Sequence, residues 1–189
     1  MTQVPHFGRV LTAMITPFTV NGELDVHEAV KLAKWLQEQG NDGLVVTGTT
    51  GEASTLTDAE KIALWEAVAQ AVTIPVIAGS ASNDTAHSVH LTKKATEVGA
   101  AGILAVGPYY NRPPQSGIAA HMGAIASATH LPVVLYDIPV RTGRKIATAN
   151  LLTLANDYSN IVALKDAAGN PAETASVIAQ APQGFQVYS

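Results

Sequence analysis

Seven short apolar runs set the strongest limit on how this 189-residue chain can fold. The runs are rich in β-branched residues, and their starts lie about 24 to 32 residues apart. That spacing leaves room for one helix and two loops each time, which is typical of parallel strands joined by helical crossovers. The runs are continuously apolar rather than alternating, as expected for strands covered on both faces. They cover residues 11–18, 43–48, 75–80, 102–108, 132–139, 161–167 and 185–189.

The segments between the runs carry helix signals. Asp25 with Glu28, and Thr57 with Glu60, have capping-box spacing just before stretches with helical apolar periodicity. Gly40 follows the first of these stretches as a C-terminal stop. An alternation of strands and helices leaves an open doubly wound sheet or a closed (β/α)8 barrel, and the even spacing favours the barrel.

We therefore expect an α/β fold, a (β/α)8 TIM barrel of which this chain contains the first six βα units and the seventh strand. The chain stops at Ser189, inside the seventh run. Because such a barrel typically takes ~250 residues, we expect residues 1–189 to form a single barrel domain that is incomplete at its C-terminal end.

Composition excludes several classes of function. Apolar residues make up 47% of the chain, while the net charge of −4 and the pI of 5.8 disfavour nucleic-acid and anionic-membrane partners. The absence of cysteine excludes thiolate metal sites and a cysteine nucleophile. His87 and His90 have helical spacing for a metal pair but lack an evident third ligand, so we expect neither a metal nor a cofactor. Without a secretory signal or a membrane-length apolar run, the expectation is a soluble, cytoplasmic protein.

One apolar run, residues 161–167, contains a lysine. A buried ammonium group is costly, so proteins rarely place one in a strand without a partner or a chemical task. Lys165 has two interpretations: it is paired with the adjacent Asp166 at the strand end, or it carries chemistry. The run by itself leaves both open.

Other polar residues follow the same ends of neighbouring runs. Residues 48–52, GTTGE, come after the second run, Tyr109 and Tyr110 after the fourth, and Tyr136 and Arg141 lie at the end of the fifth. In parallel α/β folds the chemistry gathers where the strands end. Each feature also has a structural interpretation, such as a turn, loop packing, a core ring or a surface charge. Four independent runs that present such groups at one end favour a functional site.

These residue types suit carbonyl chemistry through a Schiff base. A neutral lysine amine is the nucleophile, and lowering its pKa from ~10.4 to near 7 corresponds to roughly 4–5 kcal/mol. A tyrosine hydroxyl can shuttle the protons that dehydration of the carbinolamine requires. Threonine hydroxyls and glycine-loop amides can hold the carboxylate of a 2-oxo acid, and an arginine can clamp a second carboxylate.

Five motifs carry a resemblance to a known family. They occur in the order AMITPF, GTTGE, PYYNRPPQSG, YDIPVRTG and VALKDAAGN. In order and spacing the chain resembles the dihydrodipicolinate synthases (4-hydroxy-tetrahydrodipicolinate synthases), within the pyruvate-dependent class I aldolases that include N-acetylneuraminate lyase. The resemblance runs from about residue 9 to the last residue and covers about two thirds of a family member. In the family an eighth barrel unit and a C-terminal helical region follow.

The resemblance implies roles for the catalytic residues. Lys165 is expected to form the Schiff base with pyruvate. Tyr136 is expected to handle protons, linked through Thr49 to Tyr110, which in family tetramers reaches into the neighbouring subunit's site. The expected assembly is thus a homo-oligomer, a homotetramer in the family.

The resemblance also implies how substrates are held. Thr50 is expected to bind the pyruvate carboxylate, with Gly48 and Gly51 contributing from the same loop. Arg141 is expected to receive aspartate-semialdehyde. The implied reaction condenses the pyruvate enamine with that aldehyde and then cyclises, on the route to lysine and diaminopimelate.

Other functions stay open from the sequence. Arg141 and the paired threonines Thr49 and Thr50 favour the synthase over the neuraminate lyases. Another pyruvate-dependent 2-oxo-acid aldolase, or a non-catalytic fragment of such an enzyme, is also compatible with the motifs. Where lysine-inhibited members carry histidines this chain has Asp58 and Lys61, and where they carry a glutamate it has His87. We therefore expect weak or absent feedback inhibition by lysine.

Overall fold

The computed structural model describes residues 7–189 of the chain. Seven strands and seven helices lie in this range. The strands are β1 (Leu11–Ala13), β2 (Gly43–Val46), β3 (Val76–Gly79), β4 (Gly102–Val106), β5 (Val133–Asp137), β6 (Ile161–Asp166) and β7 (Gln186–Tyr188). The helices are α1 (Val26–Glu38), α2 (Asp58–Ala71), α3 (Thr85–Glu97), α4 (Gln115–Ser127), α5 (Pro139–Thr142), α6 (Thr148–Asp157) and α7 (Pro171–Gln180).

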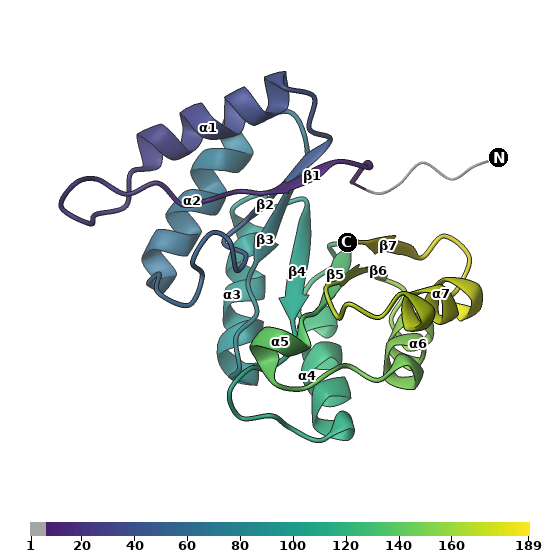
Figure 1. The fold of residues 1–189 in the computed structure, drawn as a ribbon. Coiled ribbons are helices and arrows are strands. Elements are labelled where there is room, and N and C mark those ends of the chain that lie inside the picture. Colours follow the sequence, from purple (N-terminus) through teal and green to yellow (C-terminus); the bar gives the residue numbers. More distant parts are fainter. Residues whose placement is uncertain (1–6) are drawn as a thin grey trace.

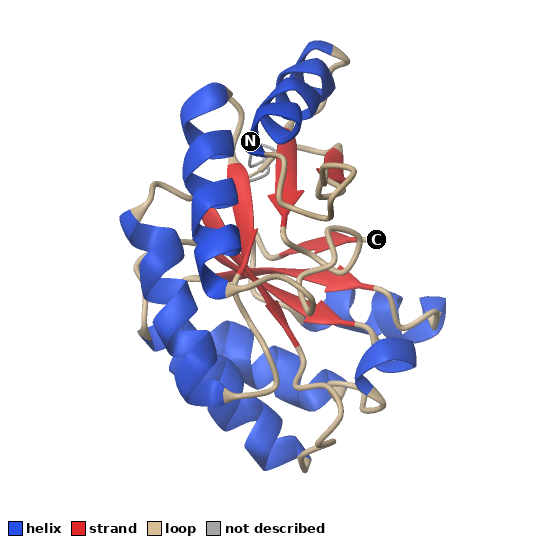
Figure 2. Ribbon diagram, turned by 90° about the vertical axis from the view of Figure 1, so that its left-hand side faces the viewer, coloured by secondary structure: helices blue, strands red, loops and turns tan. Residues whose placement is uncertain are grey.

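The strands form one parallel sheet in chain order, β1 to β7, and each pairs with the next along the sequence. The sheet curls and the helices lie outside it, so the arrangement is that of a partial (β/α) barrel (Figure 1; Figure 2). The Tyr188 hydroxyl of β7 is 3.2 Å from the Gly8 carbonyl oxygen just before β1. The two edges of the sheet therefore approach each other. The expected barrel architecture, with six βα units and a seventh strand, is confirmed.

The expected helix starts are also confirmed. The Asp25 carboxylate accepts a hydrogen bond from the Glu28 amide at the start of α1. Thr57 and Glu60 form a complete capping box at the start of α2, each side chain accepting from the other residue's amide. These contacts satisfy amides that the first turn of a helix leaves without partners.

Alternating side chains of each strand serve two separate cores. One set packs outward against the helices, and the other fills the barrel interior. Because β5 and β6 pair in register, Tyr136 lies directly opposite Lys165 in the sheet, and Asp137 lies opposite Asp166. The interior cluster consists of Phe7, Val45, Ile77, Leu104, Val134, Tyr136, Ile138 and Ala163.

The first strand is shorter than its apolar run. Only Leu11–Ala13 pair with β2, although the run extends over residues 11–18. Ile15 is 56% exposed, and Phe18 instead makes an antiparallel bridge to Leu24 in the loop that leads to α1. No helix within residues 7–189 combines the length and apolar character that a membrane crossing requires.

Candidate active site

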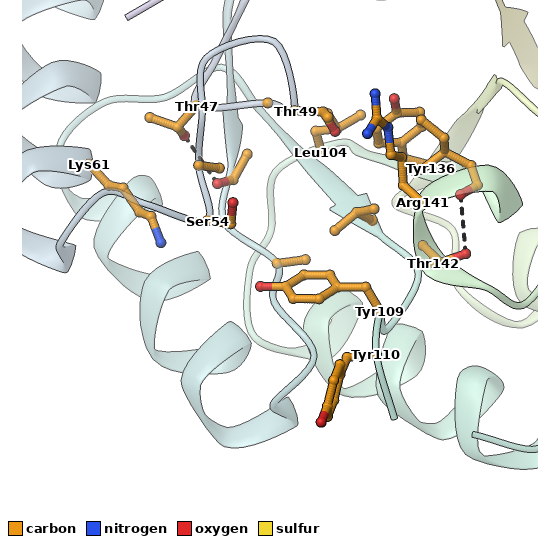
Figure 3. Close-up of a pocket in the computed structure, with 16 residues that line it drawn as sticks. Thr47, Thr49, Ser54, Lys61, Leu104, Tyr109, Tyr110, Tyr136, Arg141 and Thr142 are labelled. Atoms are coloured by element: carbon orange, nitrogen blue, oxygen red, sulfur yellow. Dashed lines mark hydrogen bonds between the residues drawn. The ribbon is translucent and has the colours of Figure 1, made fainter. Parts of the chain in front are cut away.

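A cavity of about 430 Å³ opens where strands β2 to β5 end (Figure 3). Its walls come from the loops that follow β2, β4 and β5 together with interior residues of the barrel. This is the end at which α/β barrels carry their chemistry. The lining residues are Thr47, Gly48, Thr49, Ala53, Ser54, Lys61, Gly79, Ala81, Leu104, Val106, Tyr109, Tyr110, Tyr136, Ile138, Arg141 and Thr142.

The buried Tyr136 and the half-buried Lys165 lie against each other at the ends of β5 and β6. Tyr136 is 4% exposed, and the Lys165 Nζ lies 4.4 Å from the centre of its ring, within the range of a cation–π contact. Burial lowers the pKa of Lys165 below its usual value of 10.5. A lysine with a depressed pKa is more often neutral and therefore nucleophilic, which is what imine formation requires.

Asp166 does not pair with Lys165. Its carboxylate accepts hydrogen bonds from the Ala168 amide at 2.9 Å and from the Thr174 hydroxyl at 2.6 Å. Across the described chain, no acidic side chain lies within 4.0 Å of the Lys165 ammonium. The interpretation of Lys165 as a strand-end salt bridge is therefore wrong.

Contacts with neighbouring strands and with α2 hold the glycine loop that follows β2. Thr47 has a positive φ of 56°, and its hydroxyl lies 3.1 Å from the Gly79 carbonyl oxygen and accepts from the Trp65 indole at 2.7 Å. A Cβ at Gly79 would lie 2.2 Å from the Thr47 carbonyl oxygen, so only glycine fits there. The Gly51 carbonyl accepts from the Thr16 hydroxyl at 2.6 Å. Together these contacts fix both ends of the GTTGE segment.

Only some of the loop residues expected in the site line the cavity. Gly48 and Thr49 line the cavity, and Thr49 is exposed. Thr50 and Gly51 are not among the lining residues, and Lys165 is not among them either. Tyr110 borders the cavity but is 89% exposed, with a positive φ of 70°.

The expected phenol relay is not continuous within this chain. In the part of the chain that the structure describes, no hydrogen bond joins Tyr136, Thr49 and Tyr110. The exposed Tyr110 ring is turned away from the cavity, whereas the Tyr109 ring extends across it (Figure 3). The structure therefore brings Tyr136, Thr49 and Tyr110 to one cavity without linking them by hydrogen bonds.

Arg141 lies on the short helix α5, exposed at the cavity rim near Tyr136 (Figure 3). The segment that carries it is tied to the loop after β4 and to the first residue of α4. Arg112 Nε donates to the Gly143 carbonyl at 3.0 Å, and Gln115 Nε2 donates to the Lys145 carbonyl at 2.8 Å. The guanidinium is thus positioned to meet an anionic ligand at the mouth of the cavity.

Lys61 is a cavity residue that the sequence pattern did not reveal as buried. It is 8% exposed, and burial lowers its pKa while the nearby Asp58 carboxylate opposes that shift. Asp58 itself pairs with His87 at 2.9 Å, which joins the starts of α2 and α3. Within residues 7–189 no cluster of three or more metal-ligating side chains occurs.

The family model for the dihydrodipicolinate synthetase family matches residues 6–189. The chain belongs to the dihydrodipicolinate synthetase family. A curated relative from Moorella thermoacetica, a 4-hydroxy-tetrahydrodipicolinate synthase, is 50% identical over 186 residues, which are 97% of this chain and 63% of that protein. This member of the family thus spans just under two thirds of the length of that relative.

Solved structures of the family have the same fold. The dihydrodipicolinate synthase from Cyanidioschyzon merolae, crystallised with lysine bound, is 45% identical with a TM-score of 0.96, covering 98% of this chain and 64% of that one. The chloride-inhibited enzyme from Acinetobacter baumannii, complexed with pyruvate, is 38% identical with a TM-score of 0.93, covering 97% of this chain and 63% of that one. The resemblance expected from the five motifs is therefore confirmed.

Proposed function

We propose that this chain carries the active site of a 4-hydroxy-tetrahydrodipicolinate synthase, which condenses pyruvate with aspartate-semialdehyde. The observation that carries the proposal is the half-buried Lys165 on the ring of Tyr136, with no acid to hold it as an ion pair among the described residues. Relatives that are about 50% identical to this chain are named 4-hydroxy-tetrahydrodipicolinate synthase. These relatives are longer than this chain, which covers 63% of the Moorella protein, and the activity is proposed for a whole protein of the family.

The first step is imine formation. The neutral Lys165 amine attacks the C2 carbonyl of pyruvate, and proton transfer from nitrogen to oxygen gives a carbinolamine. Protonation of its hydroxyl releases water and leaves the protonated imine, which loses a C3 proton to become the neutral enamine. The lowered pKa of Lys165 supports this role because it raises the fraction of amine available for attack.

Tyr136 is the proton carrier of these transfers in the proposal. Its ring both contacts Lys165 and lines the cavity, which supports this role. Thr49 passes the proton onward to Tyr110 of a neighbouring copy, which supports a homo-oligomeric enzyme. The 89% exposure of Tyr110 and its left-handed backbone favour such a reach across an interface.

The substrate carboxylates have separate partners in the proposal. Thr50, with the amides of Gly48 and Gly51, binds the carboxylate of pyruvate on the turn that follows β2. Arg141 binds the carboxylate of aspartate-semialdehyde at the cavity mouth. The enamine carbon then attacks the aldehyde, and the substrate's own amine displaces Lys165 from the imine carbon to close the ring.

A substrate comparison tests the proposal. The native gene product that contains these residues is assayed with pyruvate and either aspartate-semialdehyde or the amino sugar that a neuraminate lyase uses. Consumption of both pyruvate and the semialdehyde supports the synthase. Turnover of the amino sugar alone would identify the lyase alternative, and no turnover of any aldehyde would favour the non-catalytic alternative.

An arginine variant sharpens the same test. Arg141→Ala is expected to raise the KM for the semialdehyde about 10- to 100-fold, in keeping with the ~1.5–3 kcal/mol of a charged hydrogen bond. The pyruvate imine should form as before. Arg9→Ala, an exposed arginine on the segment before β1, is the matched control and should leave KM unchanged. An unchanged KM in Arg141→Ala would remove Arg141 from the proposed site.

A further inference from the structure

Asp137 is a buried carboxylate that the proposed reaction does not use. It follows Tyr136 in β5 and is 2% exposed. Because successive side chains of a strand alternate, Tyr136 faces the barrel interior and Asp137 faces the outer layer. Asp137 therefore lies directly behind the site without lining the cavity.

One hydrogen bond ties this carboxylate to the segment that carries Arg141. The Ile146 amide donates to Asp137 Oδ1 at 3.1 Å, and Ile146 is fully buried. The bond closes residues 138–146 into a loop that begins and ends at the same strand. This loop contains α5, and thereby both Arg141 and the buried Thr142 of the cavity wall. Holding its far end determines where the guanidinium can lie.

Two charged groups face Asp137 from neighbouring elements. Lys145, which precedes α6, pairs with Glu173 of α7 and attracts the carboxylate. Asp166 of β6 repels it. Burial is the largest influence, and it raises the pKa of Asp137 from 3.8 to about 6, against the opposing Ile146 bond. This carboxylate therefore changes charge close to neutral pH.

The charge is carried at a cost to folding. A carboxyl whose pKa is raised in the folded state contributes most to folding stability at low pH. That stability falls as the pH rises from 3.8 through about 6. At neutral pH an amide of the same shape could accept the Ile146 bond without this penalty. A buried charge that a neutral isostere could replace is a candidate for a functional role.

We propose that Asp137 is a positioning residue whose ionised carboxylate holds loop 138–146, and with it Arg141, against the mouth of the cavity. The expected effect of Asp137 on semialdehyde binding rests on the proposed function. Acidification neutralises the carboxylate, weakens its bond to Ile146 and loosens the loop. Further contacts of this loop come from the Arg112 guanidinium, the Gln115 amide and the Lys145–Glu173 pair.

Amide hydrogen exchange tests the bond directly and needs no turnover. In the native gene product, protection of the Ile146 amide, corrected for intrinsic exchange, should fall about fivefold between about pH 7.5 and pH 5, because a charged acceptor is replaced by a neutral one. Asp137→Asn should show pH-independent protection, and Asp157→Asn, an exposed control at the end of α6, should behave as the wild type. Equal pH dependence in the wild type and Asp137→Asn would overturn the proposal.

Thermal unfolding supplies a second test, because the expected change in Tm has the opposite sign to the change that loss of a purely structural contact would cause. Asp137→Asn is expected to raise Tm by about 5 °C at about pH 7.5, and the gain should disappear at about pH 4, where the wild-type carboxyl is neutral. A Tm that falls by the same amount at both pH values would mean that Asp137 only stabilises the fold.

Kinetics separate this proposal from the proposed function. At about pH 7.5, Asp137→Asn should raise the KM for aspartate-semialdehyde about threefold and leave pyruvate imine formation unchanged, because only the loop with Arg141 is affected. If no imine forms in the wild type, the proposed function fails while the exchange result still decides the role of Asp137. If the imine forms but KM is unchanged in Asp137→Asn, the positioning role fails alone.

Discussion

The site has two halves that differ in how they are held. Tyr136 and Lys165 stand opposite each other on adjacent strands, with Tyr136 in the interior cluster and Lys165 half-buried. Thr49 and Tyr110 stand on loops and are exposed. The strand half is therefore determined by main-chain pairing alone, whereas the loop half depends on contacts beyond the sheet.

Backbone strain makes the same division. The non-glycine residues with positive φ in the described chain are Thr47, Glu52, Tyr110 and Arg112, and all four lie in the loops after β2 and β4. Such conformations cost about 1–3 kcal/mol each, and they persist where the surroundings hold them and the function uses them. The strand half thus holds Tyr136 and Lys165 on regular backbone, whereas the loop half holds Tyr110 in a strained conformation, as expected if Tyr110 serves a neighbouring copy in the proposed enzyme.

The largest loss is expected from the strand half. Tyr136→Phe keeps the ring beneath Lys165 but removes the hydroxyl, so kcat should fall about 10²–10³-fold, the usual contribution of a positioned proton carrier. Steady-state kinetics with saturating substrates measures this. Tyr158→Phe, which lies outside the cavity, is the matched control. A loss below about tenfold in Tyr136→Phe would move the proton transfer to another group.

A subunit-mixing experiment tests whether the loop half acts across an interface. Tyr110→Phe alone should lower kcat about 10-fold to 100-fold, as expected for an outer member of a proton relay. When Tyr136→Phe and Tyr110→Phe subunits are mixed, half of the pairs contain one intact site, so activity should return to about a quarter of wild type. Without any recovery, Tyr110 would belong to its own subunit's site and the two halves would be joined within one chain.

Much of the fold follows from the sequence because burial on both faces leaves a clear pattern. Six of the apolar runs predict strands that the structure places within two residues of their ends, as with residues 161–167 and β6 (Ile161–Asp166). The first run fails at its end, since Ile15 and Phe18 are apolar but exposed. Apolar character alone cannot show where a strand leaves the sheet.

The site was predictable only in part, for a similar reason. Lys165 stood out because a cation interrupts an apolar run, and Tyr136 because it ends one. Lys61 and Asp137 gave no such signal: one lies on a helix rich in charged residues and the other within the YDIPVRTG motif. Their burial depends on packing between elements far apart in the chain, which local periodicity does not report.

A smaller effect concerns regulation. Because Lys61 is a buried cation and His87 is paired with Asp58, free lysine should find no acidic partner at this end of the cavity. We predict less than about twofold inhibition at low-millimolar lysine, a change under 0.5 kcal/mol. The double variant Lys61→His with His87→Glu should be inhibited more strongly. Strong inhibition of the wild type would show that Lys61 does not exclude the ammonium ligand.

Another small effect is expected on stability. Burial penalises the Lys165 ammonium only in the folded state, so wild-type stability should rise as the pH climbs from the lowered pKa toward 10.5. Lys165→Met removes that penalty and should raise Tm at neutral pH by about 2–4 °C, as for ~1 kcal/mol in a domain of this size. Lys31→Met, an exposed control on α1, should not change Tm. A lower Tm in Lys165→Met would mean that the ammonium is favourably bound.

The central claim is that Lys165 forms an imine with pyruvate, and borohydride trapping tests it most directly. The native gene product is incubated with pyruvate, reduced, digested and mapped by mass spectrometry. One reduced pyruvyl group is expected on Lys165, absent without pyruvate and absent in Lys165→Met. An enzyme that condenses pyruvate with the semialdehyde yet leaves Lys165 unmodified, or carries the adduct on Lys61, would contradict it.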